Sequence, residues 1–438
     1  MLSLQTIREH TDEVRNAVNQ RHTEAPIEQI IELDAERSPL LTEVETMRAD
    51  RNRAGKLIGA AKDSAERQRL IDEQRSVASK LDDLEKRLTD LDSALNKLLL
   101  EVPNLFHEDV PLGVEENSTV VLIGNGATGE EQRIDPPVPI SEWPAIEDTA
   151  SVKPHWDLGE TLGIIDFKRS AKLSGAHLPM LLGDGARLQR ALISWMLDQH
   201  RKRGYQEVYP PAMVTRDALV GTGQLPKFAD TMFETTNGRW LIPTAEVPVT
   251  NMYRDEILES SDLPIHHAAY SPCFRNEQFS AGSSSRGVKR LYQFDKVEMV
   301  RFERPDDSWE ALDQLLDDAL KLLRELKLSY RVLRLATGDL TFASAMTYDI
   351  ETWAPGDQEW LEVSSVSNFL DFQARRANLR FRTEDGDIEY LHTLNGSGFA
   401  LPRLLATILE QYQLNDGSVE VPLPLRPYLG GQERIDPA

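Results

Sequence analysis

The sequence is short of cysteine and of long apolar runs, and each shortage excludes a class of protein. Cys273 is the only cysteine in the 438 residues, so the chain can form neither an intrachain disulfide nor a zinc site built from several cysteines, which fits a reducing compartment. No apolar run approaches the length that spans a membrane. The first residues, MLSLQTIREHTDEV, lack the basic and then apolar pattern of a signal peptide. We therefore expect a soluble, cytoplasmic protein with no membrane partner.

Positive charge is also scarce. The 49 lysines and arginines are outnumbered by 72 aspartates and glutamates, which leaves a formal charge of −23. Such a chain is not drawn to nucleic acid over its whole surface, so any contact with RNA must come from a local basic patch. A chain of this length is expected to fold as two or three domains with ample cores.

Two further absences narrow the chemistry. Neither GxGxxG nor GxxxxGK[ST] occurs in its required strand-to-helix context, which disfavours a Rossmann fold and a P-loop kinase. The nine histidines show no metal-ligand spacing, so we expect no zinc. Nothing in the sequence indicates an organic cofactor.

A long helical hairpin is predicted within the first hundred residues. From about Ile27 to Val102 the chain has almost no helix breakers. Apolar residues at alternating steps of four and three, the seam of a coiled coil, stand at Val77, Leu81, Leu84, Leu88, Leu91, Leu95 and Leu98. Residues 27–62 can supply a partner, with a turn near 62–66, through Leu40, Val44, Met47, Ala54, Ile58 and Ala61. A helix of about 36 residues reaches roughly 50 Å, so we expect a projecting arm.

The outer part of this hairpin is basic although the chain is acidic. Residues 48–75 carry eight lysines and arginines against five aspartates and glutamates. Binding of phosphates is therefore plausible there. The alternative is a solvated hairpin with ordinary surface charge.

The remainder of the chain shows an α+β pattern. Six prolines between residues 103 and 144 indicate a connecting segment without a long helix. After Gly183, helices are predicted at Ala186–Lys202, Trp309–Leu326 and Leu401–Gln413, and strands at Glu207–Tyr209, Leu291–Val300 and Met346–Trp353. Ala354–Gln358 has the composition of a hairpin turn, which predicts antiparallel pairing.

Two neighbouring strand-like runs concentrate charged and aromatic side chains. In Cys273–Glu277 a period of two would place Arg275 and Glu277 on one face. After a polar loop from Gln278 to Lys289, a strand over Leu291–Val300 would align Tyr292, Phe294, Lys296 and Glu298. In a hairpin of these strands, Phe294 could stack on a base while Arg275 neutralises a phosphate. A ladder of surface charges is the alternative.

A third run points to an anionic ligand. Asn395–Gly398 leads into a helix predicted at Phe399–Gln413, with Pro402 and Arg403 in its first turn. A cation there opposes the helix dipole, so stability alone would not select it, whereas an anion bound at that helix end would. The strand-like run Trp360–Ser365 adds a carboxylate and hydroxyls suited to a magnesium-bound phosphate.

Together these segments resemble the three signature motifs of class II aminoacyl-tRNA synthetases, in the right order. The first motif is similar to Gly185–Arg203 with Gly204–Pro211, the second to Phe274–Glu277 with Tyr292–Glu298, and the third to Gly396–Arg403. The resemblance to the seryl-tRNA synthetase family covers nearly the whole chain. Its specific segments are Pro243–Glu246, Glu362–Asn368, Asp371–Arg376 and Asn395–Gly398, joined to a helical arm.

The resemblance implies an α+β fold with two main parts. One is an N-terminal antiparallel two-helix coiled-coil arm, and the other is a class II catalytic domain whose mainly antiparallel sheet is flanked by helices. The implied tRNA-binding domain covers residues 1–110, with its hairpin at about 27–102. A linker and the start of the catalytic domain follow at 111–160, the catalytic core at 161–430 and a tail at 431–438.

The resemblance also implies which residues act. Serine would be bound by Thr244, Ala245, Glu246, Glu298 and Ser397. ATP would be bound by Arg275, Asn276, Glu277, Leu291, Phe294, Glu362, Val363, Ser364, Ser365 and Arg403. Among them Arg275, Glu277 and Arg403 would be catalytic, and Glu362 and Ser365 would hold Mg²⁺ with ATP.

The implied enzyme is a homodimer that activates L-serine with ATP and transfers it to tRNA(Ser), and to tRNA(Sec) where that tRNA is present. The serine carboxylate is already nucleophilic, so cations that orient phosphates are needed and an enzyme nucleophile is not. Two alternatives remain open. One is a paralogue that makes a seryl-adenylate or related adenylate for a resistance or biosynthetic role. The other is a non-catalytic RNA-binding coiled-coil protein, against which the presence of Arg275, Glu277 and Arg403 argues.

Overall fold

The computed structural model of the chain describes residues 1–144, 152–277 and 286–438. The chain forms two compact units: one holds residues 2–19 and 24–103, and the other holds Met1, residues 20–23 and residues 104–438. None of the helices in the described ranges combines the length and apolar character that a membrane crossing needs. The domain boundaries expected from the sequence stay a proposal, and most of the predicted loop from Gln278 to Lys289 lies outside the described residues.

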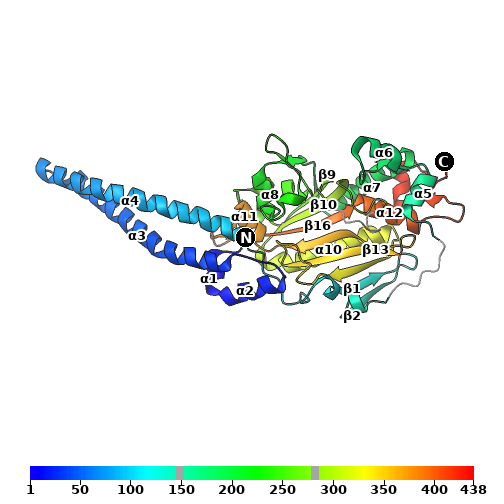
Figure 1. Cartoon of the computed structure of the whole chain (residues 1–438), viewed down its shortest axis with the longest axis horizontal. Helices are drawn as coiled ribbons and strands as arrows, with labels where there is room; N and C mark the ends of the chain where they lie inside the picture. Colours follow the sequence, from blue (N-terminus) through cyan, green and yellow to red (C-terminus); the bar gives the residue numbers. More distant parts are fainter. Residues whose placement is uncertain (145–151, 278–285) are drawn as a thin grey trace. The chain divides into compact units, whose positions relative to one another are not determined.

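The first hundred residues fold into four helices. These are α1 (Leu4–Glu9), α2 (Thr11–Gln20), α3 (Ile27–Ala60) and α4 (Ser64–Leu99). The last two lie side by side along their lengths (Figure 1), joined by residues 61–63, where the Asp63 carboxylate caps α4 by accepting from Ala65 N at 3.1 Å. The predicted antiparallel hairpin is therefore confirmed, with its turn slightly earlier than expected.

The hairpin is held by a buried apolar layer and by ion pairs across it. Leu40 and Val44 of α3 pack with Leu81, Leu88 and Leu91 of α4. Ion pairs join Arg48 to Glu85 at 2.7 Å and Lys80 to Glu43 at 2.8 Å. Toward the turn the predicted seam residues Ala54, Ile58 and Val77 are only partly buried. The hydrophobic contribution to holding the helices together is therefore smallest in the outer, basic part.

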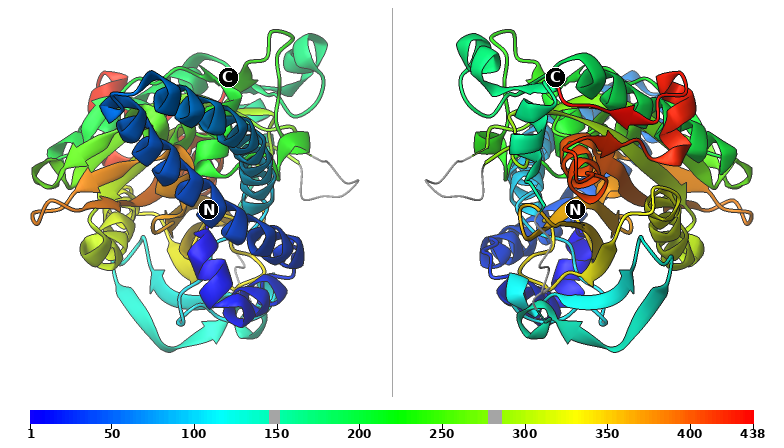
Figure 2. Two further views of the ribbon diagram at one scale, coloured as in Figure 1. Left: turned by 90° about the vertical axis from the view of Figure 1, so that its left-hand side faces the viewer. Right: turned by 90° about the vertical axis from the view of Figure 1, so that its right-hand side faces the viewer.

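The larger unit is built on a nine-stranded sheet. Its strand order is β2 (Glu131–Pro139), β1 (Thr119–Gly124), β11 (Tyr330–Arg334), β12 (Met346–Ala354), β13 (Glu359–Asn368), β16 (His392–Ala400), β10 (Gln293–Glu303), β9 (Ile265–Phe274) and β5 (Gln206–Val208). Every neighbouring pair is antiparallel except β5 with β9. The predicted turn after Ala354 joins β12 to β13. The edge strand β2 and its neighbour β1 (Figure 2, cyan) arise from the proline-rich segment.

Three helices cover one face of this sheet. They are α7 (Gly183–Lys202), α10 (Ser308–Glu325) and α12 (Leu401–Gln411), close to the bounds predicted from the sequence. Their apolar sides share one core with Val297 and Met299 of β10. Because strand side chains alternate, Phe294, Lys296 and Glu298 lie on the opposite face of β10. The sheet therefore carries a core on one face and a polar site on the other.

Shorter elements complete the unit. The remaining helices are α5 (His155–Thr161), α6 (Phe167–Ser174), α8 (Arg216–Thr222), α9 (Glu246–Thr250) and α11 (Phe372–Ala377). A small sheet contains β15 (Ile388–Tyr390), β14 (Arg380–Arg382) and β8 (Ile257–Glu259), and strand pairs join β17 (Val419–Glu420) with β18 (Arg434–Ile435), β3 (Ile165–Asp166) with β4 (Met180–Leu181), and β6 (Met213–Val214) with β7 (Trp240–Leu241).

Two local predictions are wrong. Strand β9 ends at Phe274, so Arg275 and Glu277 follow the strand instead of sharing a face of it. Of the two starts predicted for the last helix, Leu401 is correct and Phe399 is wrong, because β16 stays paired with β10 as far as Ala400. That pairing contains one extra residue on β16, and Phe399 has a φ of +94° while its ring is fully buried. Burial of the ring in the core offsets the strain of this backbone conformation.

Candidate active site

Two adjoining cavities lie on the polar face of the sheet. The first is lined by residues from the segment after β9, from the segment before β10, from β10, β13 and β16, and from the start of α12. They include Arg275, Glu277, Arg290, Leu291, Phe294, Glu362, Val363, Ser365 and Arg403. The second, with a volume of about 680 Å³, includes Thr244, Glu246, Asn276 and Glu298. Both are lined by Arg275, Glu277, Lys296, Ser365 and Ser397, so they form one continuous site.

The segment after β9 is held in the site by hydrogen bonds that replace strand pairing. Arg275 N donates to Tyr292 O at 2.9 Å, and Asn276 N donates to Thr231 O at 2.9 Å. The Asn276 side chain donates to Asp230 O at 3.0 Å. The Arg275 guanidinium lies 5.2 Å from the centroid of the Phe294 ring. A cation and an aromatic face thus stand together where the sequence predicted them, although on a loop.

Arg403 is oriented by two neighbouring segments. It lies in the first turn of α12, where its Nη1 donates to both the main-chain and the side-chain oxygen of Glu362, each at 2.8 Å. Its Nε donates to Lys289 O at 3.0 Å. Burial raises the pKa of Glu362, but the charges of Arg403 and Arg275 outweigh burial and leave that pKa below its ordinary value. Glu362 is therefore an ionised acceptor beside two arginines.

An irregularity in β13 determines which of its side chains reach the site. Ile350 pairs with Ser364 and the next residue, Glu351, pairs with Glu362, so Val363 is an extra residue on β13. This bulge turns Glu362 and Ser365 toward the same cavity, although three positions of a regular strand would separate their faces. Ser364 faces away and its hydroxyl donates to Ser397 O at 2.6 Å.

The second cavity contains a buried ionic cluster. Lys296 Nζ lies 2.5 Å from Glu298 Oε2, which also accepts from Ser397 Oγ at 3.2 Å. Glu246 is 9% exposed and accepts from Gln373 Nε2 at 2.6 Å. Burial, and then the neighbouring Glu298 carboxylate, raise the pKa of Glu246 to about 7. The cluster thus holds two carboxylates with one lysine, and a second ammonium group would be electrostatically favoured there.

The structure brings most of the predicted residues together and separates two from them. Ala245 is fully buried in a core cluster with Val249 and Ala269, and its side chain does not line the cavity. Ser364 is also buried and points away from it. The other predicted residues line one cavity or both.

Two residues of the site were not selected from the sequence. The sequence placed Lys296 on the correct face of its strand. Its ion pair with Glu298 was not predicted, because strand periodicity does not show that both side chains are buried. Gln373 lies on α11 and reaches Glu246 across the fold. Gln373 belongs to Asp371–Arg376, one of the segments that carry the family resemblance. The resemblance pointed to the segment as a whole and not to Gln373.

This arrangement suits an anionic ligand with a flat base and a small polar ligand beside it. Arg275 and Arg403 can bind phosphates, and Phe294 offers an aromatic face. Cys273 is buried, which raises the pKa of its thiol and makes it a poor nucleophile. No group of three or more histidine, cysteine or acidic side chains suited to a metal occurs among residues 1–144, 152–277 and 286–438.

Two family models match the chain. Residues 1–106 match the seryl-tRNA synthetase N-terminal domain. Residues 232–412 match the class II tRNA synthetase core domain of the G, H, P, S and T enzymes.

Similar proteins match over the full length. A serine–tRNA ligase of Thermomicrobium roseum is 51% identical over 99% of this chain and 95% of its own length. A serine–tRNA ligase of Chloroflexus aurantiacus is 49% identical, with complete coverage of both chains. The crystal structure of the Pyrococcus horikoshii seryl-tRNA synthetase complexed with ATP covers both chains completely, with a TM-score of 0.87 and 34% identity.

Proposed function

The chain belongs to the seryl-tRNA synthetase family, and on that premise we propose how its residues perform the family's reaction, the ATP-dependent, AMP-forming ligation of serine to tRNA. One continuous site, formed by two adjoining cavities that combine two arginines with a buried carboxylate cluster, carries the proposal. The paralogue and the non-catalytic scaffold are not favoured, because the relatives that match nearly the whole chain are serine–tRNA ligases.

ATP is assigned to the first cavity. Phe294 offers a face for the adenine ring, and Arg275 lies close enough to that ring to bind a phosphate of the same nucleotide. Glu277 and Asn276 adjoin Arg275, Val363 and Leu291 provide apolar lining, and Arg403 faces the γ-phosphate side. Ser364 contributes only by holding the Ser397 carbonyl.

The reaction then needs orientation and charge stabilisation. The serine carboxylate attacks the α-phosphorus of ATP, a new P–O bond forms, and the bond to pyrophosphate breaks. Arg275 and Arg403 stabilise the charge that develops on the phosphate oxygens. In the second step the terminal ribose hydroxyl of tRNA attacks the seryl carbonyl and AMP leaves.

Mg²⁺ is proposed to enter with ATP. A carboxylate, Glu362, and a hydroxyl, Ser365, share the cavity, and this small set of ligands suits Mg²⁺, which otherwise binds water and phosphate oxygens. The ion would neutralise phosphate charge. Titration of the exchange rate with Mg²⁺ and a chelator tests this requirement.

Serine is assigned to the second cavity. Its ammonium group would pair with Glu246, and its hydroxyl would lie among Thr244, Glu298 and Ser397, which line the same space. Ala245 supports the pocket from the core and would contribute only through its backbone.

Pyrophosphate exchange into ATP tests the activation step, with serine, threonine, alanine and glycine as substrates. We expect exchange with serine. Alanine should be slower by roughly 10⁴-fold, because it leaves buried groups that hydrogen-bond the hydroxyl unpaired. Equal rates with alanine and serine would contradict the assignment of the second cavity.

The raised pKa of Glu246 predicts a pH dependence for serine. As the pH falls through about 7 this carboxyl becomes protonated, so the serine ammonium group loses its ionic partner. The kcat/KM for serine should therefore fall about tenfold from pH 8 to pH 6. In Glu246→Gln it should be low and independent of pH over this range. The kcat/KM for ATP, measured at saturating serine, is the control, and an equal fall in both parameters would refute the role of Glu246.

Three further properties are proposed. The tRNA partner is tRNA(Ser), and tRNA(Sec) where present. The chain is a symmetric homodimer, which is supported by Tyr209, an aromatic residue 87% exposed in the segment that resembles the first motif, and sedimentation should give twice the chain mass of 49.5 kDa. The enzyme is cytoplasmic, as cell fractionation would test.

A further inference from the structure

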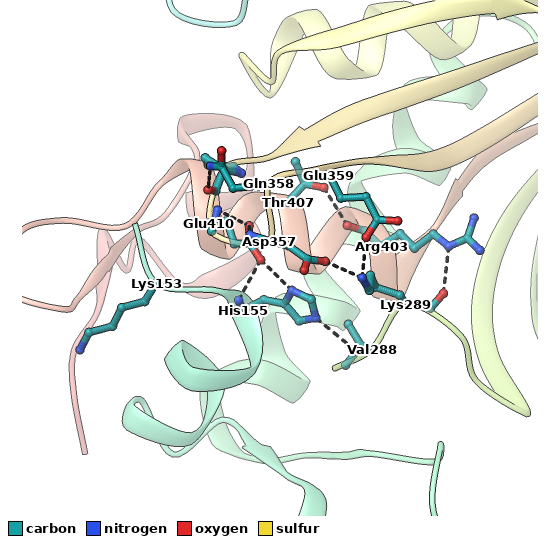
Figure 3. A network of polar contacts seen from close by, with 12 residues as sticks. Lys153, His155, Val288, Lys289, Asp357, Gln358, Glu359, Arg403, Thr407 and Glu410 are labelled. Carbon is teal, nitrogen blue, oxygen red and sulfur yellow. Dashed lines mark hydrogen bonds and ion pairs between the residues drawn. The ribbon is translucent and has the colours of Figure 1, made fainter. Parts of the chain in front are cut away.

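A buried carboxylate next to the site joins two separate segments of the chain. Glu410, near the end of α12, has a side chain with no exposed surface. Its Oε1 accepts from His155 N at 2.8 Å and lies 2.7 Å from His155 Nδ1. Its Oε2 accepts from Gly356 N at 2.8 Å and from Asp357 N at 3.1 Å. Glu410 therefore ties the start of α5 to the β12–β13 turn, and all four of its partners donate (Figure 3).

His155 links Glu410 to residues 286–291, the segment that leads into β10. Its Nε2 lies 3.2 Å from Val288 N, which can only donate. The ring must therefore accept at Nε2 and donate from Nδ1 to Glu410. The contact is close, because a Cβ at Gly287 would lie 2.1 Å from His155 Nε2. The imidazole thus fixes the main chain at residues 287–288.

A second connection runs from Glu410 to the same segment through the turn. Glu410 holds the main chain of Asp357, and the Asp357 carboxylate lies 2.7 Å from Lys289 Nζ. The same lysine donates to Glu359 Oε2 at 2.6 Å. Lys289 is 7% exposed, and these two carboxylates raise its pKa although burial opposes them. Glu410 therefore holds Val288 through His155 and Lys289 through Asp357.

The segment in turn orients Arg403. The carbonyl oxygen of Lys289 accepts from Arg403 Nε, while Glu362 accepts from Nη1. A shift of residues 288–289 would move one of the two acceptors that fix the plane of the guanidinium group. We propose that Glu410 and His155 are positioning residues for the use of ATP, which hold the Lys289 carbonyl where it orients Arg403. The inference rests on the proposed role of Arg403.

Glu410→Gln is the main test. The amide keeps the shape of the side chain, but whichever way it is turned its NH₂ group faces N–H donors. In the full-length enzyme the kcat/KM for ATP in pyrophosphate exchange should fall about tenfold, while the KM for serine stays within about twofold. His155→Asn, which removes the acceptor for Val288 N, should change the same parameter in the same direction.

A matched control separates positioning from stability. Tyr330→Phe removes a hydrogen bond from a buried side chain to Glu131, at the edge of the sheet. It should lower the midpoint of thermal unfolding and leave the kcat/KM for ATP within about twofold. Equal losses of kcat/KM in this control and in Glu410→Gln would overturn the inference.

A double-mutant cycle tests the route through Arg403. In an Arg403→Ala background, Glu410→Gln should cost less than about twofold, because the group it positions is absent. A tenfold cost in both backgrounds would overturn the inference while leaving the role of Arg403 intact. If Arg403→Ala by itself leaves the kcat/KM for ATP unchanged, the assigned role of Arg403 is wrong and the inference falls with it.

Discussion

Arg403→Ala is expected to lower the kcat of serine-dependent pyrophosphate exchange by about a thousandfold. A fixed cation aimed at developing phosphate charge contributes on the order of 10²–10³ to a rate in a site that excludes water. In the unsubstituted chain the Glu362 carboxylate accepts a hydrogen bond from Arg403. The substitution removes this donor and leaves the carboxylate facing the phosphates. Loss of attraction and added repulsion act in the same direction.

Two further variants make this expectation specific. Arg403→Lys keeps the charge but loses the planar fork whose separate nitrogens donate to Lys289 O and to Glu362, so an intermediate loss of roughly 10–100-fold is expected. Arg382→Ala removes an exposed arginine of β14 and should leave the rate within about twofold. A folded Arg403→Ala enzyme with the rate of the Arg382→Ala enzyme would refute the assignment.

Shortening the helical hairpin should separate the two half-reactions. Deleting Met47–Ala60 and Ser64–Val77 removes two heptads from each helix, which preserves the seam and retains the natural turn. The buried layer around Leu40 and Leu81 remains, while seven of the eight cations of residues 48–75 are lost. Charging of tRNA should fall by more than about a hundredfold, because those phosphate contacts disappear. Pyrophosphate exchange should stay within about twofold.

Charge reversals test whether the basic residues themselves matter. In the described part of the chain, Lys56 and Lys62 are exposed and not in ion pairs, and the same holds for Lys86 and Lys97 nearer the other end of the hairpin. Lys56→Glu with Lys62→Glu should lower the kcat/KM for tRNA about tenfold and weaken its salt dependence. Lys86→Glu with Lys97→Glu is the matched control. Undiminished charging by the shortened enzyme would contradict the role of the arm.

The sequence predicted the elements whose pattern is repetitive. The heptad spacing predicted the bounds of the hairpin and of its turn to within a few residues. It could do so because the spacing of four and three residues recurs along the whole helix. The seam is only partly buried toward the turn, at Ala54, Ile58 and Val77, and at its other end Leu99 is buried in place of Leu98. There α4 leaves its partner helix, and the heptad rule no longer applies.

The site was predicted less completely, because its geometry depends on contacts between distant segments. Arg275 and Glu277 reach the cavity from a loop after β9, which strand periodicity could not show. His155 and Glu410 carry no local signal, since their burial arises only when α5, the β12–β13 turn and α12 come together. Gln373 meets Glu246 for the same reason.

The bulge in β13 changes which residue numbers face the core. Before the bulge the odd-numbered residues face it, and after the bulge the even-numbered residues do. Leu361 and Val363 are the apolar core residues at odd positions, but beyond the bulge the core residue is Val366, at an even position. Apolar substitutions tolerated at odd numbers before residue 363 should therefore be tolerated at even numbers after it. If Val363 were drawn into regular pairing and the bulge were lost, Glu362 and Ser365 would be three regular positions apart and would face opposite sides of the sheet. The strand can offer both side chains to one ion because it is one residue longer than the neighbour with which it pairs.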